Sequence, residues 1–251
     1  MSSPSGKVKE AIVGEQFLAT LATHPTKLTV TKLYTPNGPR FTFKNSAGGE
    51  AMLEVESRMG FMSLRSHQFL DATSAQPVIH LQETGLEERK WEAYRGNSTR
   101  ESDKIFDAVN KSWYFFLMGT KIEVFLRKSS DEPKPAGVLV DGNSSGGMQK
   151  PADFVVLGNY YRGGLTVFRG CGCVLAGHDI AQINRVSRLF KCSEMGGEHT
   201  YDVSVKPGED QAFVLALTVI LDQMYNDDRV ISSIKMIKAR KCLPFGDITM
   251  L

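Results

Sequence analysis

Residues 209–228 read EDQAFVLALTVILDQMYNDD, and this stretch decides the fold. No side chain from Ala212 to Leu221 is charged, and Thr218 is the only polar one. A helix that crosses a bilayer needs about 20 largely apolar residues, and this uncharged run is roughly half that length. Because its apolar side chains cover every helical angle, we expect a helix over residues 209–226 that is buried on all sides of a protein core.

The flanking residues support a helix over a strand. Pro207 and Gly208 precede the stretch, and Glu209 and Asp210 stand where the positive end of a helix favours acidic side chains. An apolar run of this length also exceeds the usual strand of about 5–6 residues. The residues expected to form the core of the helix are Phe213, Leu215, Leu217, Ile220 and Leu221.

Most of the chain before the helix shows the alternation of half-buried strands. In KLTVTKLYT (27–35), Leu28, Val30 and Lys32 share one face and Thr29 and Thr31 the other. Such alternation between turn signals is typical of antiparallel sheet. About eleven or twelve strands are expected, the clearest at 27–35, 40–45, 51–57, 76–83, 90–95, 104–112, 121–127, 153–159, 165–169, 173–177 and 199–205.

Many strands combined with one helix that has no polar face favour a mainly β fold: a closed antiparallel barrel of about twelve strands around a central apolar α-helix. Closure also removes exposed sheet edges. We expect one barrel domain over residues 25–229, after an N-terminal extension (1–24) and before a basic tail (230–251). Residues 128–152 are rich in Pro, Gly and Ser, which predicts a loop insertion, with a linker between two halves as the alternative.

Three segments resemble the LURP-one-related family of plant proteins: TKIEVFLRK (120–128), DFVVLGNY (153–160) and YDVSVKPGEDQAFVLALTVILDQMYNDDR (201–229). PVIHLQE (77–83) and KWEAYRG (90–96) precede them in matching order. The resemblance implies a tubby-like fold, a barrel threaded by a central helix, related to tubby proteins and phospholipid scramblases. It further implies binding to phosphoinositides or membranes and a role in plant defence. It brings no catalytic residues.

Composition limits the function classes. A formal net charge of +2 disfavours a dedicated nucleic-acid-binding protein, which usually carries a strongly basic face. The sequence begins without the apolar run of a secretory signal, and its four cysteines suit a reducing compartment. We therefore expect an intracellular, cytoplasmic protein, with peripheral membrane or nuclear location left open.

The motifs that could carry chemistry are weak. GNSSG (142–146) matches G-x-S-x-G, but the GGMQKP that follows cannot begin the helix that a nucleophile elbow needs. Cys171, Cys173, Cys192 and His178 lack the paired spacing of a zinc site. We therefore expect no catalytic residue, no metal and no cofactor, and hence a protein that is not an enzyme.

Two basic segments are candidates for binding lipid phosphates: QINRVSRLFK (182–191) and VISSIKMIKARKCL (230–243). Basic side chains beside apolar ones suit an anionic membrane surface; solvated faces are the alternative. The candidate lipid-binding residues are Arg185, Arg188, Lys191, Lys235, Lys238, Arg240 and Lys241.

The leading hypothesis is a non-enzymatic tubby-like binding protein that docks on phosphoinositide-containing or other anionic membranes and is linked to plant defence signalling. A protein-interaction or regulatory module without lipid binding is the first alternative. Phospholipid scrambling is the second, although the apolar helix is too short to cross a bilayer.

Overall fold

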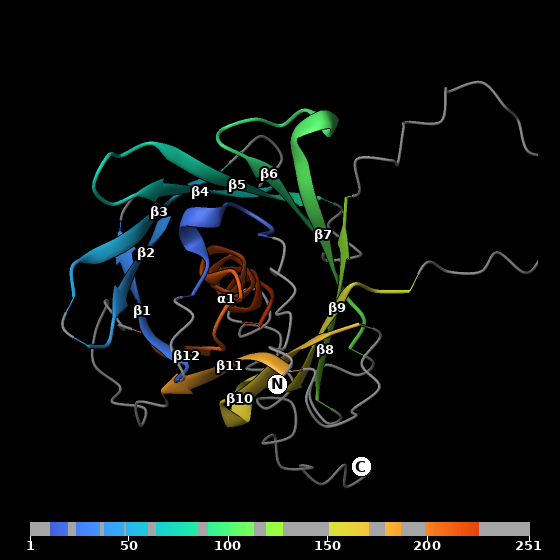
Figure 1. Cartoon of the computed structure of the whole chain (residues 1–251). Coiled ribbons are helices and arrows are strands. Elements are labelled where there is room, and N and C mark those ends of the chain that lie inside the picture. Colours follow the sequence, from blue (N-terminus) through green and yellow to red (C-terminus); the bar gives the residue numbers. More distant parts are fainter. Residues whose placement is uncertain are drawn as a thin grey trace, which may run out of the picture.

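The computed structural model describes residues 11–19, 24–35, 38–47, 49–59, 64–84, 90–112, 119–127, 151–170, 179–186 and 199–225. Within them, twelve strands form a closed barrel around one α-helix (Figure 1). The strands are β1 (Thr26–Thr35), β2 (Gly38–Asn45), β3 (Ala51–Met59), β4 (Arg65–Asp71), β5 (Pro77–Thr84), β6 (Lys90–Arg95), β7 (Lys104–Asn110), β8 (Thr120–Leu126), β9 (Phe154–Asn159), β10 (Gly164–Arg169), β11 (Asp179–Val186) and β12 (His199–Val205).

Each strand pairs antiparallel with the next one along the chain, and β1 pairs with β12 to close the ring. In the closing pair, Thr26 lies opposite Val205 and Lys32 opposite His199. Closure satisfies the backbone hydrogen-bonding groups that an open sheet would leave at its edges. The predicted fold class, a closed antiparallel barrel around a central helix, is confirmed.

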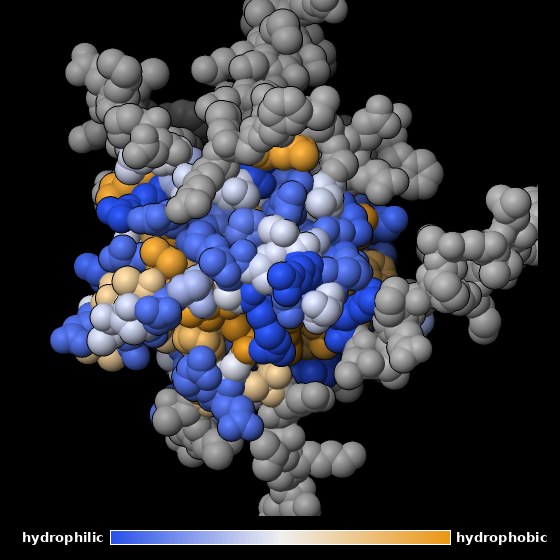
Figure 2. Space-filling view, turned by 90° about the horizontal axis from the view of Figure 1, so that it is seen from above, coloured by the Kyte–Doolittle hydropathy of each residue, from blue (hydrophilic) through white to orange (hydrophobic). Residues whose placement is uncertain are grey.

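The apolar side chains that alternate along the strands fill the inside of the barrel. On β2, Phe41 and Phe43 are buried, and on β5, Ile79 and Leu81 are buried, while the residues between them face outward. Figure 2 shows the barrel from above, the side on which β4, β5 and β6 lie in Figure 1, and this outer surface is mainly hydrophilic. The apolar set of each strand therefore points toward the helix.

The helix α1 (Gln211–Tyr225) occupies the middle of the barrel, where Figure 1 shows it nearly end on. Every residue of the helix after Gln211 is buried, so an apolar run with no polar face is what this position requires. The prediction of a buried helix is confirmed for the five core residues, each at most 1% exposed: Phe213, Leu215, Leu217, Ile220 and Leu221.

We name the two ends of the barrel after the helix: the αN end, where Gln211 begins α1, and the αC end, where α1 finishes at Tyr225. The αN end holds residues 11–19, which include the short 3₁₀ helix η1 (Glu15–Phe17). The buried carboxylate of Asp210 accepts hydrogen bonds from the backbone N–H groups of Ile12 (3.0 Å), Val13 (2.7 Å) and Phe213 (3.1 Å). One side chain thus caps the helix and fixes the N-terminal segment on it.

Two strands were not predicted, and some predictions lie outside the described residues. The missed strands are β4 and β11. Residues 128–150, most of the expected insertion, are not described, nor are 173–177, where a strand was expected. The boundary placed after residue 24 stays a prediction, although Val13 and Phe17 belong to the buried core.

Candidate functional site

The αC end contains a buried polar network around the last turns of α1. Asp222 accepts a hydrogen bond from Lys32 Nζ on β1 at 2.5 Å and one from the Tyr201 hydroxyl on β12. Gln223 Nε2 donates to the same carboxylate at 3.1 Å. The side chains of Lys32 and Asp222 are 3% and 0% exposed, so this ion pair is fully enclosed by the barrel.

Two tyrosines extend the network toward the surface. The hydroxyls of Tyr160 and Tyr201 lie 2.7 Å apart, and Tyr160 belongs to the 3₁₀ helix η4 (Tyr160–Arg162) between β9 and β10. Burial, reinforced by the charge of Asp222, raises the pKa of both tyrosines well above its usual value. Both hydroxyls therefore stay protonated and serve as hydrogen-bond donors.

A histidine and an arginine complete the inner side of this end. His67 Nδ1 lies 2.7 Å from Ser57 Oγ, and the His67 ring stacks on Trp91 with ring centroids 5.3 Å apart. Burial, aided by the charge of Arg65, lowers the pKa of His67 to about 3. Arg65 forms two hydrogen bonds with Glu83, at 2.7 and 2.9 Å, and donates to the carbonyl of Gln223 at 3.0 Å. A cation at the negative end of a helix is favourable.

The charged groups of the network balance one another, which favours a structural role for it. Its carboxylates accept from cations and hydroxyls, its tyrosines are protonated and His67 is neutral. Among the described residues, no three His, Cys, Asp or Glu side chains are grouped so that they could hold a metal ion.

Arg185, one of the predicted lipid-binding residues, lies at the rim of the same end. Its guanidinium lies over the Tyr160 ring, 5.1 Å from the centroid, and its Nη2 is 3.4 Å from His199 Nδ1. Burial, aided by the charge of Arg185, lowers the pKa of His199. Arg185 is only half-buried and forms no ion pair within the described part of the chain. Its charge is therefore available to an anion at the rim.

Local backbone geometry brings η4 against Arg185. Gly163 ends η4 with φ of +90°, and a Cβ at that position would lie 2.9 Å from the Arg185 carbonyl oxygen. The carbonyl of Gly163 also accepts a hydrogen bond from the Arg185 amide. Only glycine fits this contact without strain, and it places Tyr161 and the exposed Arg162 beside β11.

Exposed apolar side chains gather at the same rim. Within the described residues, the large hydrophobic side chains that are exposed are Leu33 (46%), Tyr161 (43%) and Val186 (41%). Leu33 follows the buried Lys32 on β1, Val186 lies opposite Thr200 near the start of β12, and Tyr161 contacts the Tyr225 ring. All three therefore lie at the αC end, and we call them the αC rim.

The other predicted lipid-binding residues lie outside the described residues: Arg188, Lys191, Lys235, Lys238, Arg240 and Lys241. Their attachment points are described. The segment 187–198 joins Val186 to His199, and the segment 226–251 follows Tyr225. Both segments are thus connected to the barrel at the αC end, the end that carries Arg185.

The sequence contains a signal for the buried ion pair of this network. Lys32 shares a strand face with Leu28 and Val30, and Asp222 ends the apolar run of the helix. A charge on an apolar strand face and an opposite charge on an apolar helix predict a buried ion pair, because an unpaired buried charge is costly. Tyr160, Tyr201 and His67 gave no comparable signal.

The comparisons with known proteins agree with this architecture. The family model described as LURP-one-related matches residues 26–222. The chain belongs to the LURP-one-related family. Protein LURP-one-related 15 from Arabidopsis thaliana is 28% identical over 157 residues, which are 62% of this chain and 61% of that protein.

A second relative from Arabidopsis thaliana, protein LURP-one-related 10, is 27% identical over 154 residues, which are 61% of this chain and 66% of that protein. The alignments thus span less than two thirds of either LURP-one-related relative. An X-ray structure of an Arabidopsis thaliana protein is similar with a TM-score of 0.54 and 22% identity, covering 86% of this chain and 99% of that one. At this identity, the likeness concerns the fold alone.

None of the described helices combines the length and the apolar content that a bilayer span requires.

Proposed function

We propose that this LURP-one-related protein is a non-enzymatic binding protein that docks on anionic phospholipid surfaces, phosphoinositides included, through the αC end of its barrel. The observation that carries the proposal is the gathering of exposed apolar side chains and uncompensated cations at that one end. Leu33, Tyr161 and Val186 are exposed there, and Arg162 and Arg185 form no ion pair within the described residues.

This combination suits the boundary between lipid headgroups and acyl chains. Apolar side chains gain free energy by leaving water, and aromatic rings with a polar tip such as Tyr161 are favoured at membrane interfaces. Each Lys or Arg near an anionic surface adds about 1 kcal/mol. Arg185 keeps its guanidinium at the rim by lying on the Tyr160 ring, which orders the charge without neutralising it.

The basic tail is attached at the same end. Residues 229–241 (RVISSIKMIKARK) contain five basic side chains and no acidic one, and they follow Tyr225 at the αC end. Several basic residues near one apolar surface provide the two attractions, hydrophobic and electrostatic, that stable but reversible peripheral binding needs. A role in plant defence signalling is part of the proposal only as the biological setting implied by the family.

Co-sedimentation of the full chain with vesicles tests the proposal. We compare vesicles of phosphatidylcholine alone with vesicles that also contain phosphatidylserine or a phosphatidylinositol bisphosphate, at low salt, where electrostatic attraction is screened least. Arg162→Gln combined with Arg185→Gln should weaken binding to anionic vesicles about 30-fold, from two contributions of about 1 kcal/mol. Leu33→Ser combined with Val186→Ser should weaken binding to both anionic compositions.

The matched control is Arg100→Gln, which removes an exposed arginine at the αN end and should leave binding unchanged. Circular dichroism of each variant checks the fold. Absence of binding to either anionic composition at low salt, or an equal loss in Arg100→Gln, would show that the αC end is not a membrane-docking surface and would favour protein recognition instead.

A further inference from the structure

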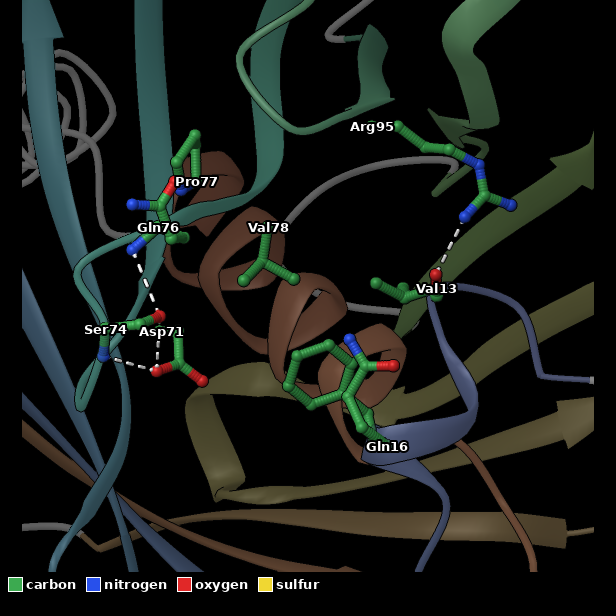
Figure 3. Close-up of a pocket in the computed structure, with 9 residues that line it drawn as sticks. Val13, Gln16, Asp71, Ser74, Gln76, Pro77, Val78 and Arg95 are labelled. Carbon is green, nitrogen blue, oxygen red and sulfur yellow. Dashed lines mark hydrogen bonds between the residues drawn. The ribbon is translucent and has the colours of Figure 1, made fainter.

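A cavity of about 280 Å³ opens at the αN end (Figure 3). This end lies opposite the proposed membrane surface at the αC end. It lies between the N-terminal segment, the turn after β4 and the ends of β5 and β6. Its volume is just below the range of about 300–1,000 Å³ typical of sites for drug-sized ligands. The lining residues that matter here are Val13, Phe17, Asp71, Pro77, Val78 and Arg95.

One side of the cavity is cationic. Arg95 Nη1 donates a hydrogen bond to the Val13 carbonyl at 2.8 Å, which holds the guanidinium against the N-terminal segment. Arg95 is exposed and forms no ion pair within the described residues. The remaining N–H groups of its planar fork can bind a carboxylate with two parallel hydrogen bonds.

The opposite side is anionic. In Figure 3, Asp71 and Arg95 lie on opposite sides of the cavity, with Val78 and Val13 between them. Asp71 Oδ1 accepts hydrogen bonds from the backbone N–H groups of Thr73 (3.0 Å) and Ser74 (2.8 Å). The hydrogen bonds from Ser74 lower the pKa of Asp71, so the carboxylate is ionised at neutral pH. These bonds use one oxygen and leave the other to face a cation.

The surface between the two charges combines apolar side chains with the polar side chains of Gln16 and Gln76. Val13 and Phe17 are buried members of the core, and Val78 is partly buried and packs against it. A ligand that fits this arrangement has a carboxylate at one end, an ammonium group at the other and an apolar part between. A single α-amino acid carries both charged groups on one carbon atom and does not suit charges on opposite sides of a cavity. A peptide gains about 3.3–3.6 Å of length per residue and does.

We propose that the αN cavity binds short peptides of two or three residues with free termini and an apolar side chain, the carboxylate on Arg95 and the amino group on Asp71. This inference is independent of the membrane-docking proposal. The bound peptide would connect the N-terminal segment, through Val13 and Phe17, to the turn after β4. Binding should therefore also slow amide exchange in residues 11–19.

Isothermal titration calorimetry of the full chain with the tripeptide Ala-Phe-Ala tests the inference. We expect saturable binding of the free peptide and at least tenfold weaker binding of its N-acetylated form, its C-amidated form and free phenylalanine. Asp71→Asn keeps an oxygen for the Thr73 and Ser74 amides but removes the charge. Arg95→Gln removes the guanidinium charge together with its fork of N–H donors.

Each variant should bind the free peptide at least tenfold more weakly than the natural chain. In Asp71→Asn, acetylation of the peptide should have no further effect, and in Arg95→Gln, amidation should have none. Arg100→Gln serves as the control with an exposed arginine outside the cavity. No saturable binding up to 10 mM peptide, or equal binding of free and capped peptides, would overturn the proposal whatever the vesicle experiment shows.

Discussion

Lys32 and Asp222 place two opposite charges inside the barrel, with side chains 3% and 0% exposed. Taking a charge out of water is costly, and removal of one partner leaves the other buried and uncompensated. Asp222→Asn should therefore lower the free energy of unfolding by about 3–5 kcal/mol, measured by urea denaturation.

The control for this prediction is an exposed pair. Arg40 and Glu54 lie 3.9 Å apart with side chains 48% and 39% exposed, so Glu54→Gln should change stability by less than about 1 kcal/mol. The double change Lys32→Met with Asp222→Leu should recover much of the loss, since apolar side chains of similar size often replace a buried pair well. Equal losses of stability in Asp222→Asn and Glu54→Gln would show that breaking the buried ion pair costs no more than breaking the exposed one.

The buried imidazole of His67 should make stability depend on pH. Its pKa is lowered from 6.5 to about 3 in the folded chain, so between these values the unfolded chain binds a proton that the folded chain does not. Stability should then fall as the pH falls below about 6.5, by up to about 1.4 kcal/mol per pH unit, with no contribution above that value.

His67→Gln isolates this effect, because glutamine can still bond to Ser57 but does not titrate. Urea denaturation at pH 7, 6 and 5 should show a clearly smaller decline for the variant than for the natural chain. The remaining decline includes a contribution from His199, because burial lowers the pKa of His199 as well. An identical decline in both proteins would mean that His67 is protonated without cost in the folded state.

At the scale of single residues, the sequence predicted the apolar core of the helix but not the polar groups around it. Phe213 and Leu217 are recognisable as core because their neighbours are apolar too. His67 is not, because its burial depends on partners from other strands, Ser57 on β3 and Trp91 on β6. The burial of a polar residue can be predicted only once its partners are known.

At the scale of elements, Asp210 joins the start of the helix to the N-terminal segment. The sequence predicted the favourable charge at the helix start, but not that Asp210 also accepts hydrogen bonds from Ile12 and Val13. Those hydrogen bonds connect residues almost two hundred positions apart in the sequence. A local sequence pattern therefore cannot predict them.

Asp210→Ala should therefore cost more than the loss of an ordinary N-cap, which is about 0.5–2 kcal/mol. It should also speed amide hydrogen exchange at Ala19, whose N–H donates to the Glu209 carbonyl at 2.8 Å. Asp202→Ala, which removes an exposed acid from β12, is the control and should change neither quantity appreciably. Normal exchange at Ala19 in Asp210→Ala would show that the N-terminal segment is held by its apolar contacts alone.

The missed strands show the limits of the period-two signal. β4 (RSHQFLD) has Phe69 as its only buried apolar side chain, next to the buried His67 on the same face. β11 (DIAQINRV) turns Arg185 to the inner face near its end, opposite Tyr201. In both strands a polar side chain takes an inward position, His67 in β4 and Arg185 in β11, so the apolar alternation is interrupted.

At the scale of the whole molecule, closure of the barrel around one helix should make unfolding a single cooperative event. The two ends share α1, whose fifteen residues span about 20 Å at 1.5 Å per residue. The strands form one closed ring around this helix. Loss of the helix from the core would therefore expose the inner face of the entire sheet.

Changes at the two ends should nevertheless add in free energy, because residues this far apart share no partners. We expect the losses of Asp210→Asn at the αN end and Tyr201→Phe at the αC end to sum to that of the double variant within about 0.5 kcal/mol, with the same dependence on urea concentration. Tyr201→Phe removes the hydroxyl that links Tyr160 to Asp222. Asp210→Asn keeps an oxygen for the Phe213 amide but replaces the one that accepts from Ile12 and Val13. A coupling above about 1 kcal/mol, or a second transition in the double variant, would mean that the helix transmits strain between the ends or that one end unfolds by itself. Agreement would instead establish that the αC end and the αN cavity can each be altered without disturbing the other, as two separate binding surfaces require.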